Sequence, residues 1–424
     1  MSVMKPLSER IPDIDNYYDL ISKDQTPINH NALDRVVKEW GGWDRIRIRS
    51  EEATVSLMKK STNSGSPYFV KRRNVVNKTI PCIVDENEGH ALQFLGTHSQ
   101  EWGACAVLGW RGQEGGPERE DVKQRVVWMF PFAVNIQELR VYQPLIEYAQ
   151  RHNIVPAWVG MDAVDERITR LFDTKPDRDL IVCTDFSKFD QHFNQSCQRA
   201  AKSILYRLVS ASPDAEAWFK EVYPIKYSIP LAYDWDKIRF GSHGMASGSG
   251  GTNADETLVH RALQHEAALS KNVELNPNSM CLGDDGILTY PGITSKDVMQ
   301  VYTAHGLDMN ATKQYESTQD CVYLRRWHHK SYRNNENICV GVYSTFRALG
   351  RLCEQERYYD PDIWSPKMVA LRQLSIIENC KWHPYRERFA EYCMKGDKFR
   401  LGLDIPGFLD NIDSEAKQAM DYMP

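Results

Sequence analysis

Two adjacent acidic residues interrupt an apolar stretch in the C-terminal half of this sequence. Met280-Cys281-Leu282 precedes the tetrapeptide Gly283-Asp284-Asp285-Gly286, and Ile287-Leu288 follows it. Two apolar runs separated by a short Asp-Gly segment are typical of a β-hairpin. The hairpin would hold both carboxylates at its turn. The alternative is that this turn has no role beyond the fold.

A third carboxylate stands at the end of a second apolar run. Residues 180–184 are typical of a buried strand, and Asp185 follows them directly. Mg²⁺ binds carboxylate and phosphate oxygens, usually through only one or two protein carboxylates. Nucleotidyl transfer commonly uses two such ions. If the two strands are neighbours, Asp185 and Asp284 would supply ligands to both ions. The alternative is that Asp185 only caps the segment that follows.

A glycine-rich segment lies between these two sites. Ser247-Gly248-Ser249-Gly250-Gly251-Thr252 precedes residues 254–269, which have helical composition. Unhindered backbone N–H groups before a helix can approach phosphates and sugars closely. The segment lacks the Gly-Lys-Ser/Thr ending of a P-loop, which disfavours a phosphotransferase of that class. Taken alone, it is equally consistent with a flexible turn.

Composition limits the class of protein. The 424 residues are 42% apolar and 26% charged, as in a globular protein of two or three packed units. A net charge of −5 argues against coating nucleic acid through bulk positive charge. A local basic channel stays open, because residues 59–78 contain six basic residues and no acidic one. No apolar run is long enough to cross a bilayer, and the ten cysteines form no CxxC pair, so we expect an intracellular protein with no membrane contact.

In their order and spacing, these three segments resemble the motifs of viral RNA-directed RNA polymerases. Motif A of that family, D-x4-D, matches Asp185 and Asp190, and motif B, SG-x3-T, matches the segment from Ser247 to Thr252. Motif C, GDD, matches residues 283–285. The residues of these motifs are most similar to those of the polymerases of double-stranded RNA viruses of the picobirnavirus or partitivirus kind.

The resemblance implies an α+β fold shaped like a right hand, with fingers, a palm of antiparallel sheet flanked by helices, and a mainly helical thumb. We expect fingers over residues 1–175, a palm over 176–330 with a fingers insertion at about 212–245, and a thumb over 331–424. The implied function is template-directed RNA synthesis from ribonucleoside triphosphates by two-metal nucleotidyl transfer. Such an enzyme replicates and transcribes a viral RNA genome.

The resemblance also assigns roles to individual residues. Motif G (T-x2-G-x-P) is matched from Thr62 to Pro67, motif F by basic residues near 119–125, motif D by a lysine after residue 306, and motif E near 323–326. The implied catalytic residues are Asp185, Asp284, Asp285 and Lys313, of which the three aspartates are also the metal ligands. The implied ribose-selecting residues are Asp190, Ser247, Thr252 and Asn253. The implied triphosphate-binding residues are Arg119, Lys123 and Arg125, and the template-binding residues are Thr62, Gly65, Pro67, Gly248, Arg325 and Arg326.

One position departs from the family pattern. Many related polymerases have Asn four residues after the motif B threonine, whereas this sequence has Glu256 there. Either Asn253 takes the role of that Asn, or Glu256 orients Asp190. The nearest alternative function is that of a reverse transcriptase. Such an enzyme usually has an aromatic residue at the position of Asp190, which excludes the 2′-hydroxyl. A second alternative is a non-catalytic RNA-binding structural protein with the same fold.

Cofactors and partners follow from the same resemblance. We expect two Mg²⁺ ions, for which Mn²⁺ can substitute. The expected partners are the RNA template and product, ribonucleoside triphosphates and, as a candidate, the viral capsid protein. We expect a monomer located in the host cytoplasm and in the virion interior.

Overall fold

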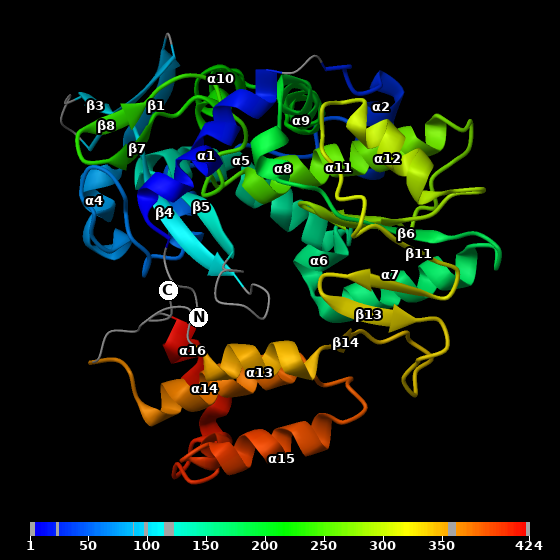
Figure 1. Cartoon of the computed structure of the whole chain (residues 1–424). Helices are drawn as coiled ribbons and strands as arrows, with labels where there is room; N and C mark the ends of the chain where they lie inside the picture. Colours follow the sequence, from blue (N-terminus) through cyan, green and yellow to red (C-terminus); the bar gives the residue numbers. More distant parts are fainter. Residues whose placement is uncertain are drawn as a thin grey trace.

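A four-stranded antiparallel sheet, which we call the central sheet, lies in the right half of the molecule as seen in Figure 1. The computed structural model describes residues 5–22, 25–87, 89–96, 101–113, 123–354 and 362–420. The strand order is β11-β6-β10-β9. The strands are β6 (Ile181–Thr184), β9 (Met280–Leu282), β10 (Asp285–Leu288) and β11 (Tyr315–Ser317). The predicted buried strand before Asp185 and the predicted hairpin are therefore both present.

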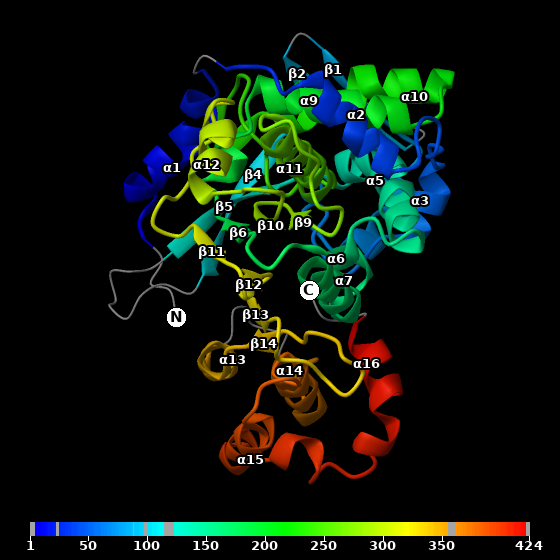
Figure 2. The ribbon, with the colours of Figure 1, turned by 90° about the vertical axis from the view of Figure 1, so that its right-hand side faces the viewer.

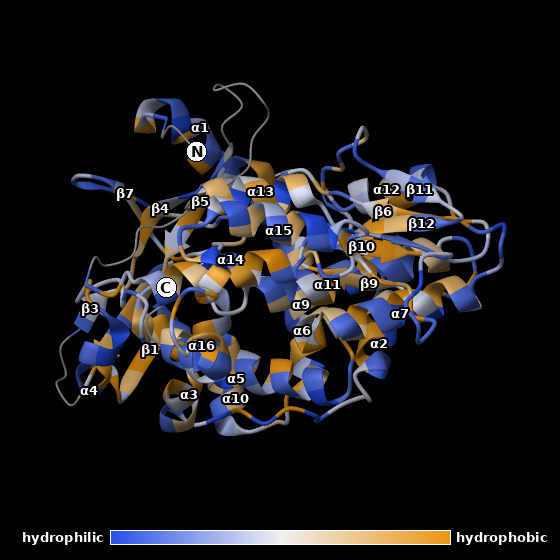
Figure 3. Cartoon of the chain, turned by 90° about the horizontal axis from the view of Figure 1, so that it is seen from below, coloured by the Kyte–Doolittle hydropathy of each residue, from blue (hydrophilic) through white to orange (hydrophobic). Residues whose placement is uncertain are grey.

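The residues of β6 face two different cores because side chains alternate along a strand. Ile181 and Cys183 pack with helix α7 (Met161–Thr174), whereas Val182 belongs to the larger core on the other face. All four residues of β6 are buried. Figure 3 shows mainly hydrophobic colours on β6, β9 and β10. Asp185 and Asp285 lie at the ends of these apolar strands, whereas the outer strand β11 is polar.

Several helices pack around the sheet, and the most buried of them is α11 (Thr252–Leu269). It contacts β9 and also three further helices. Polar residues of α11, including Asp255, Glu256 and His260, are buried together with its apolar ones. The other helices of this layer are α8 (Phe189–His192), α9 (Gln195–Leu208) and α12 (Ser295–Thr303). Thr294 caps α12 by accepting a hydrogen bond from the backbone N–H of Asp297.

Two further sheets, β1-β2-β3 and β5-β4-β7-β8, combine strands of the first 130 residues with two strands from residues 231–239, and helices lie beside them. In the second sheet β4 pairs with β7 in parallel, although the two strands are far apart in sequence. The strands are β1 (Cys82–Asn87), β2 (His90–Leu95), β3 (Glu101–Gly103), β4 (Ala106–Gln113), β5 (Lys123–Met129), β7 (Leu231–Asp234) and β8 (Lys237–Arg239). The helices are α1 (Leu7–Asp19), α2 (His30–Glu39), α3 (Glu51–Leu57), η2 (Arg72–Asn74), α4 (Val76–Thr79), α5 (Phe132–Arg151), α6 (Pro156–Val159) and α10 (Pro213–Ala217).

A small sheet joins the central sheet to the C-terminal helices (Figure 2). Its strands are β12 (Asp320–Tyr323), β13 (Arg326–His329) and β14 (Val342–Tyr343). Two residues with positive φ, Leu324 and Arg325, form the turn between β12 and β13. The helices beyond it are α13 (Thr345–Cys353), α14 (Pro366–Glu378), α15 (Arg386–Gly396) and α16 (Ile412–Met420). Ser365 caps α14 and Pro366 is its first residue.

Candidate active site

The pairing of β6 with β10 brings three carboxylates to one edge of the central sheet. Thr184 pairs with Gly286, so that Asp185 directly after β6 lies beside the turn that carries Asp284. The side chains of Asp185 and Asp284 are 43% and 48% exposed, which leaves oxygens of both accessible to a ligand. The sequence pattern thus predicted correctly that these strands are neighbours.

Asp285 is held differently from Asp284. Its Oδ2 atom accepts a hydrogen bond of 2.8 Å from the backbone N–H of Leu324, in the turn between β12 and β13. Burial raises the pKa of Asp285 to about 7, and the neighbouring Asp284 and Asp185 carboxylates add to this effect. Burial likewise raises the pKa of Asp284, where Asp190 and Asp185 contribute repulsion. The site therefore has a surplus of negative charge.

A basic side chain lies near each of two of these carboxylates. Nη2 of Arg125 lies 3.9 Å from Oδ2 of Asp284, and Nζ of Lys313 lies 3.8 Å from Oδ2 of Asp185. Both basic side chains are more than half exposed. Long, exposed ion pairs compensate charge weakly. They leave both cations available to a triphosphate.

Helix α11 fixes the conformation of the Gly283 turn. Oγ1 of Thr257 accepts a hydrogen bond from the N–H of Gly283, and Nδ1 of His260 donates to the Gly283 carbonyl. Burial lowers the pKa of His260 to about 4, so the ring is neutral and its proton is on Nδ1. A Cβ atom on Gly286 would lie 2.6 Å from the His260 ring, which explains why this position is glycine.

The glycine-rich segment before α11 is held against β5 and points its first hydroxyl at Asp190. Oγ of Ser247 donates to Oδ2 of Asp190, and the backbone N–H of Trp128 donates to the Ser247 carbonyl. Gly248 has a φ of +143°, and a Cβ atom there would lie 1.9 Å from the Trp128 carbonyl oxygen. Thr252 begins α11 and donates its hydroxyl to the Ser249 carbonyl. Only glycine fits at position 248.

The two residues considered in place of the family's Asn have different surroundings. Oδ1 of Asn253 accepts a hydrogen bond of 2.8 Å from the indole N–H of Trp158. Glu256 is buried and interacts with Asp190. Burial and the Asp190 carboxylate raise the pKa of Glu256 well above its usual range, which favours its neutral form. A neutral acid can donate a hydrogen bond to Asp190.

The predicted template-binding residues lie in two places. The carbonyl of Thr62 accepts a hydrogen bond from the N–H of Arg72, and Gly65, at φ +61°, passes close to the Phe130 carbonyl. Pro67 follows in the same loop. The positive charge of Arg325 acts to lower the pKa of Asp285. Arg326 turns away from the carboxylates, because it donates to Asn379 of the C-terminal helices and lies over the Tyr343 ring.

Two of the predicted triphosphate-binding residues cannot be placed in the site. Arg119 lies outside the described residues, and so does the side chain of Lys123, the first residue of β5. Arg125 is therefore the member of this group that the structure brings to the carboxylates.

Sequence reasoning missed several residues that hold this site together. Thr257 and His260 lie one and two turns after Asn253 on α11, so helical spacing could have found them. Gln314 donates from Nε2 to the Asp185 carbonyl at 2.7 Å, and its Oε1 accepts from the Asp185 N–H. Its only signal in the sequence is its position next to Lys313.

The carboxylate set fits a divalent cation that also binds substrate. Among the described residues, no three His, Cys, Asp or Glu side chains converge closely enough to enclose an ion by themselves. Mg²⁺ does not require such an enclosure, because it usually keeps waters and substrate phosphates beside one or two carboxylates. Asp185 and Asp284 offer this kind of open, hard-oxygen site.

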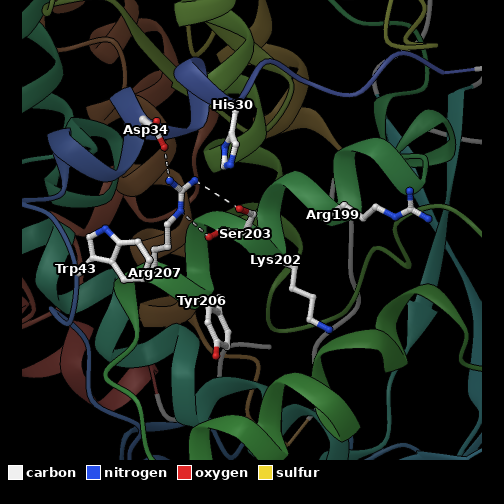
Figure 4. Close-up of a pocket in the computed structure, with 8 residues that line it drawn as sticks. All are labelled: His30, Asp34, Trp43, Arg199, Lys202, Ser203, Tyr206 and Arg207. Carbon is white, nitrogen blue, oxygen red and sulfur yellow. Dashed lines mark hydrogen bonds and ion pairs between the residues drawn. The ribbon is translucent and has the colours of Figure 1, made fainter.

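A separate hollow of about 580 Å³ lies on the outer surface between α2 and α9 (Figure 4). Arg207 reaches across it to Asp34, and two aromatic side chains, Trp43 and Tyr206, also line it. None of the predicted site residues belongs to this lining.

Comparison with known proteins decides the family. The family model described as viral RNA-dependent RNA polymerase matches residues 42–340. The chain belongs to this polymerase family. A curated relative, named "Potential RNA-dependent RNA polymerase" of a human picobirnavirus (strain Human/Thailand/Hy005102/-), is 65% identical over all 424 residues and 79% of its own length.

Solved structures agree with this assignment. The crystal structure of the RNA-dependent RNA polymerase of a human picobirnavirus is 65% identical, with a TM-score of 0.95, over all of this chain and 80% of that one. An insertion-loop deletion mutant of such a polymerase is 64% identical, with the same TM-score, over 99% of this chain and 82% of that one. The sicinivirus 3Dpol polymerase, 13% identical with a TM-score of 0.59 over 90% and 84% of the two chains, shares the fold.

The predicted α+β polymerase fold, the predicted enzyme class and the predicted likeness to picobirnavirus polymerases are therefore confirmed. RNA polymerase activity is favoured over a reverse transcriptase and over a non-catalytic RNA-binding protein. In the described part of the polymerase, no helix combines the length and apolar character that a membrane crossing needs.

Proposed function

We propose that this polymerase extends RNA on an RNA template by two-metal nucleotidyl transfer. The observation that carries the proposal is the register of β6 and β10, which sets the exposed carboxylates of Asp185 and Asp284 side by side. These two residues would hold two Mg²⁺ ions, for which Mn²⁺ can substitute, with Asp285 as a secondary ligand. When bound, such ions activate the attacking 3′-hydroxyl and neutralise the leaving pyrophosphate.

The side chains around the carboxylates have separate roles in the proposal. Arg125, together with Arg119 and Lys123, binds the triphosphate and balances its charge. Lys313, beside Asp185, delivers a proton to the leaving pyrophosphate. Positioning and charge stabilisation provide most of the rate enhancement.

Sugar selection is assigned to the residues around Asp190. Its carboxylate, oriented by the Ser247 hydroxyl, accepts a hydrogen bond from the ribose 2′-hydroxyl, which a deoxyribonucleotide lacks. Thr252 shapes the loop that carries Ser247. Asn253 or Glu256 completes the site from α11.

The wider assignments complete the proposal. Fingers, palm and thumb correspond to residues 1–175, 176–330 (with an insertion at about 212–245) and 331–424. Template RNA contacts the loop with Thr62, Gly65 and Pro67, then Gly248, and finally the motif E arginines Arg325 and Arg326. We place the enzyme, as a monomer, in the host cytoplasm and in the virion interior, where the capsid protein is a candidate partner.

One assay tests the central part of this proposal. Purified protein is supplied with Mg²⁺ or Mn²⁺, a single-stranded RNA template and labelled nucleotides. Ribonucleotide incorporation should disappear in Asp284→Asn and persist in Asp177→Asn, a matched change at a carboxylate whose side chain is 99% exposed. Calorimetric titration of Mn²⁺ into the same variants should show weaker binding in Asp284→Asn alone. Unchanged incorporation or unchanged Mn²⁺ binding would overturn the assignment.

A further inference from the structure

Hydrogen bonds connect the basic segment around Arg72 to the glycine-rich loop. Nη2 of Arg72 donates to Oδ1 of Asn135 on α5 at 2.8 Å. Nδ2 of Asn135 donates in turn to the Gly248 carbonyl at 3.4 Å and to Oε1 of Glu138 at 3.2 Å. Three segments that are distant in sequence thus meet in one continuous set of contacts.

Glu138 forms direct hydrogen bonds with the loop. Its Oε2 atom accepts a hydrogen bond from the Ser249 hydroxyl, and its Oε1 atom accepts from the Gly250 N–H at 3.1 Å. The side chain is only 1% exposed, so water cannot replace these donors without a cost. Asn135 and Glu138 are three residues apart on α5 and therefore share one face of that helix.

The loop is consequently held from two sides through its backbone and through Ser249, while the side chain of Ser247 is left to contact Asp190. The backbone of Trp128 in β5 fixes Ser247 and Gly248 on one side, and α5 fixes residues 248–250 on the other. The Ser247 hydroxyl then points at Asp190. A small shift of the Glu138 carboxylate would therefore move the Ser247 hydroxyl relative to the sugar site.

Arg72 has unused capacity at the other end of this path. Its Nη1 atom donates no hydrogen bond among the described residues, its Nε atom is buried without a partner there, and its guanidinium lies over the Phe132 ring, 5.2 Å from the centroid. No carboxylate forms an ion pair with it within the described ranges of the chain. A guanidinium with spare donors in a basic segment suits a phosphate of the nucleic acid backbone.

We propose that Asn135 and Glu138 are positioning residues that couple a template phosphate at Arg72 to the loop that selects the ribose. The inference rests on the proposed role of Ser247 and Asp190 in sugar selection. Because coupling of two binding events is reciprocal, template binding tightens ribonucleotide binding by the same factor as the ribonucleotide tightens template binding. A purely structural role for Glu138 would change stability and leave this factor unchanged.

The test measures coupling and selectivity in four variants of the full chain. Template affinity is measured with and without a non-hydrolysable ribonucleotide, and KM and kcat are measured for NTP and dNTP. Glu138→Gln and Arg72→Gln should each lose most of the coupling, a change of about fivefold or more. Glu138→Gln should also lower the preference for NTP over dNTP through KM. Two control variants should keep both the coupling and the preference for NTP. They are Glu147→Gln, at a carboxylate of the same helix that pairs with Arg49, and Lys71→Gln, at an exposed neighbour of Arg72.

Ser247→Ala separates the two levels of the proposal. If Ser247→Ala reduces sugar selectivity while Glu138→Gln and Arg72→Gln keep full coupling, the inference is overturned and sugar selection by the loop stands. If Ser247→Ala leaves selectivity unchanged, the sugar-selecting role itself fails. Should Glu138→Gln fail to fold, as shown by thermal unfolding, Arg72→Gln still decides the matter because Arg72 lies in a surface segment.

Discussion

Two groups of acidic residues near the glycine-rich loop are compensated in opposite ways. Asp255 is fully buried, yet it accepts hydrogen bonds from Tyr142 at 2.8 Å and Tyr227 at 2.6 Å, and Nζ of Lys226 lies 3.3 Å away. Lys226 is itself fully buried and lies 3.6 Å from the Tyr223 ring centroid. Every charge in this cluster has a partner within the protein.

Among the described residues, the carboxylates at the sheet edge have no buried cation beside them. The ion-pair partners of Asp185 and of Asp284 in this part of the chain are the exposed Lys313 and Arg125, at 3.8 and 3.9 Å, and the pKa values of Asp284 and Asp285 are raised. A buried structural acid requires a cation that the protein supplies, because an unpaired buried charge is costly. In the proposed function, the acids at the sheet edge stay short of compensating positive charge until metal and triphosphate bind. The difference between the two groups then separates the structural carboxylate from those that we propose to be functional.

The largest expected effect is at the undercompensated edge. Asp185→Asn should reduce ribonucleotide incorporation by about 10³-fold or more, because a metal ligand that stabilises transition-state charge is lost. In EDTA the same variant should be at least as stable as the wild type, since one repulsive charge is gone. Incorporation assays and thermal unfolding in EDTA check both statements. A large loss of stability in EDTA would contradict the comparison.

The opposite pattern is expected for the buried cluster. Lys226→Met should lower the free energy of unfolding by about 3–5 kcal/mol, because Asp255 is left buried and uncompensated. The double variant Lys226→Met with Asp255→Asn should recover part of this loss. Urea denaturation gives these values, and the double-mutant cycle isolates the pair. If the losses of unfolding free energy in the two single variants simply add in the double variant, the Lys226–Asp255 ion pair does not stabilise the fold.

The sequence predicts the exposed site better than the buried cluster that supports it. The strand before Asp185 and the hairpin with Asp284 are local patterns, and each was found where it was expected. Lys226 and Glu138 have no local signal, because a buried lysine or glutamate looks like a surface one until distant segments pack around it. The contact of Arg326 with Asn379 likewise has no local signal, because it joins segments that are distant in sequence.

A smaller effect should appear in the pH dependence of stability. The pKa of Asp285 is raised from 3.8 to about 7, so folding favours its protonated form. Its contribution to stability is complete below pH 4 and is lost as pH rises toward 7. Buried neutral His260, with a pKa of about 4, acts in the opposite direction over the same range.

The contribution of Asp285 must therefore be read from a difference between proteins. In metal-free buffer, the wild type minus Asp285→Asn should show unfolding free energy that falls from pH 4 to pH 7. Asp177→Asn serves as the control, because its side chain is almost fully exposed. Saturating Mg²⁺ should reduce the slope by favouring the ionised carboxylates. Parallel curves for wild type and Asp285→Asn would show that the charge surplus at the edge does not include this residue.

The smallest expected effect concerns the weak compensation of Asp284 by Arg125. Because both side chains are about half exposed, Arg125→Gln should change the free energy of unfolding by less than about 1 kcal/mol. The KM for NTP should nevertheless rise by about tenfold, the scale of one charge-assisted hydrogen bond to a phosphate, while kcat changes less. If stability falls by several kcal/mol and KM stays unchanged, Arg125 is a structural partner of Asp284, and the edge carboxylates are compensated from within the protein after all.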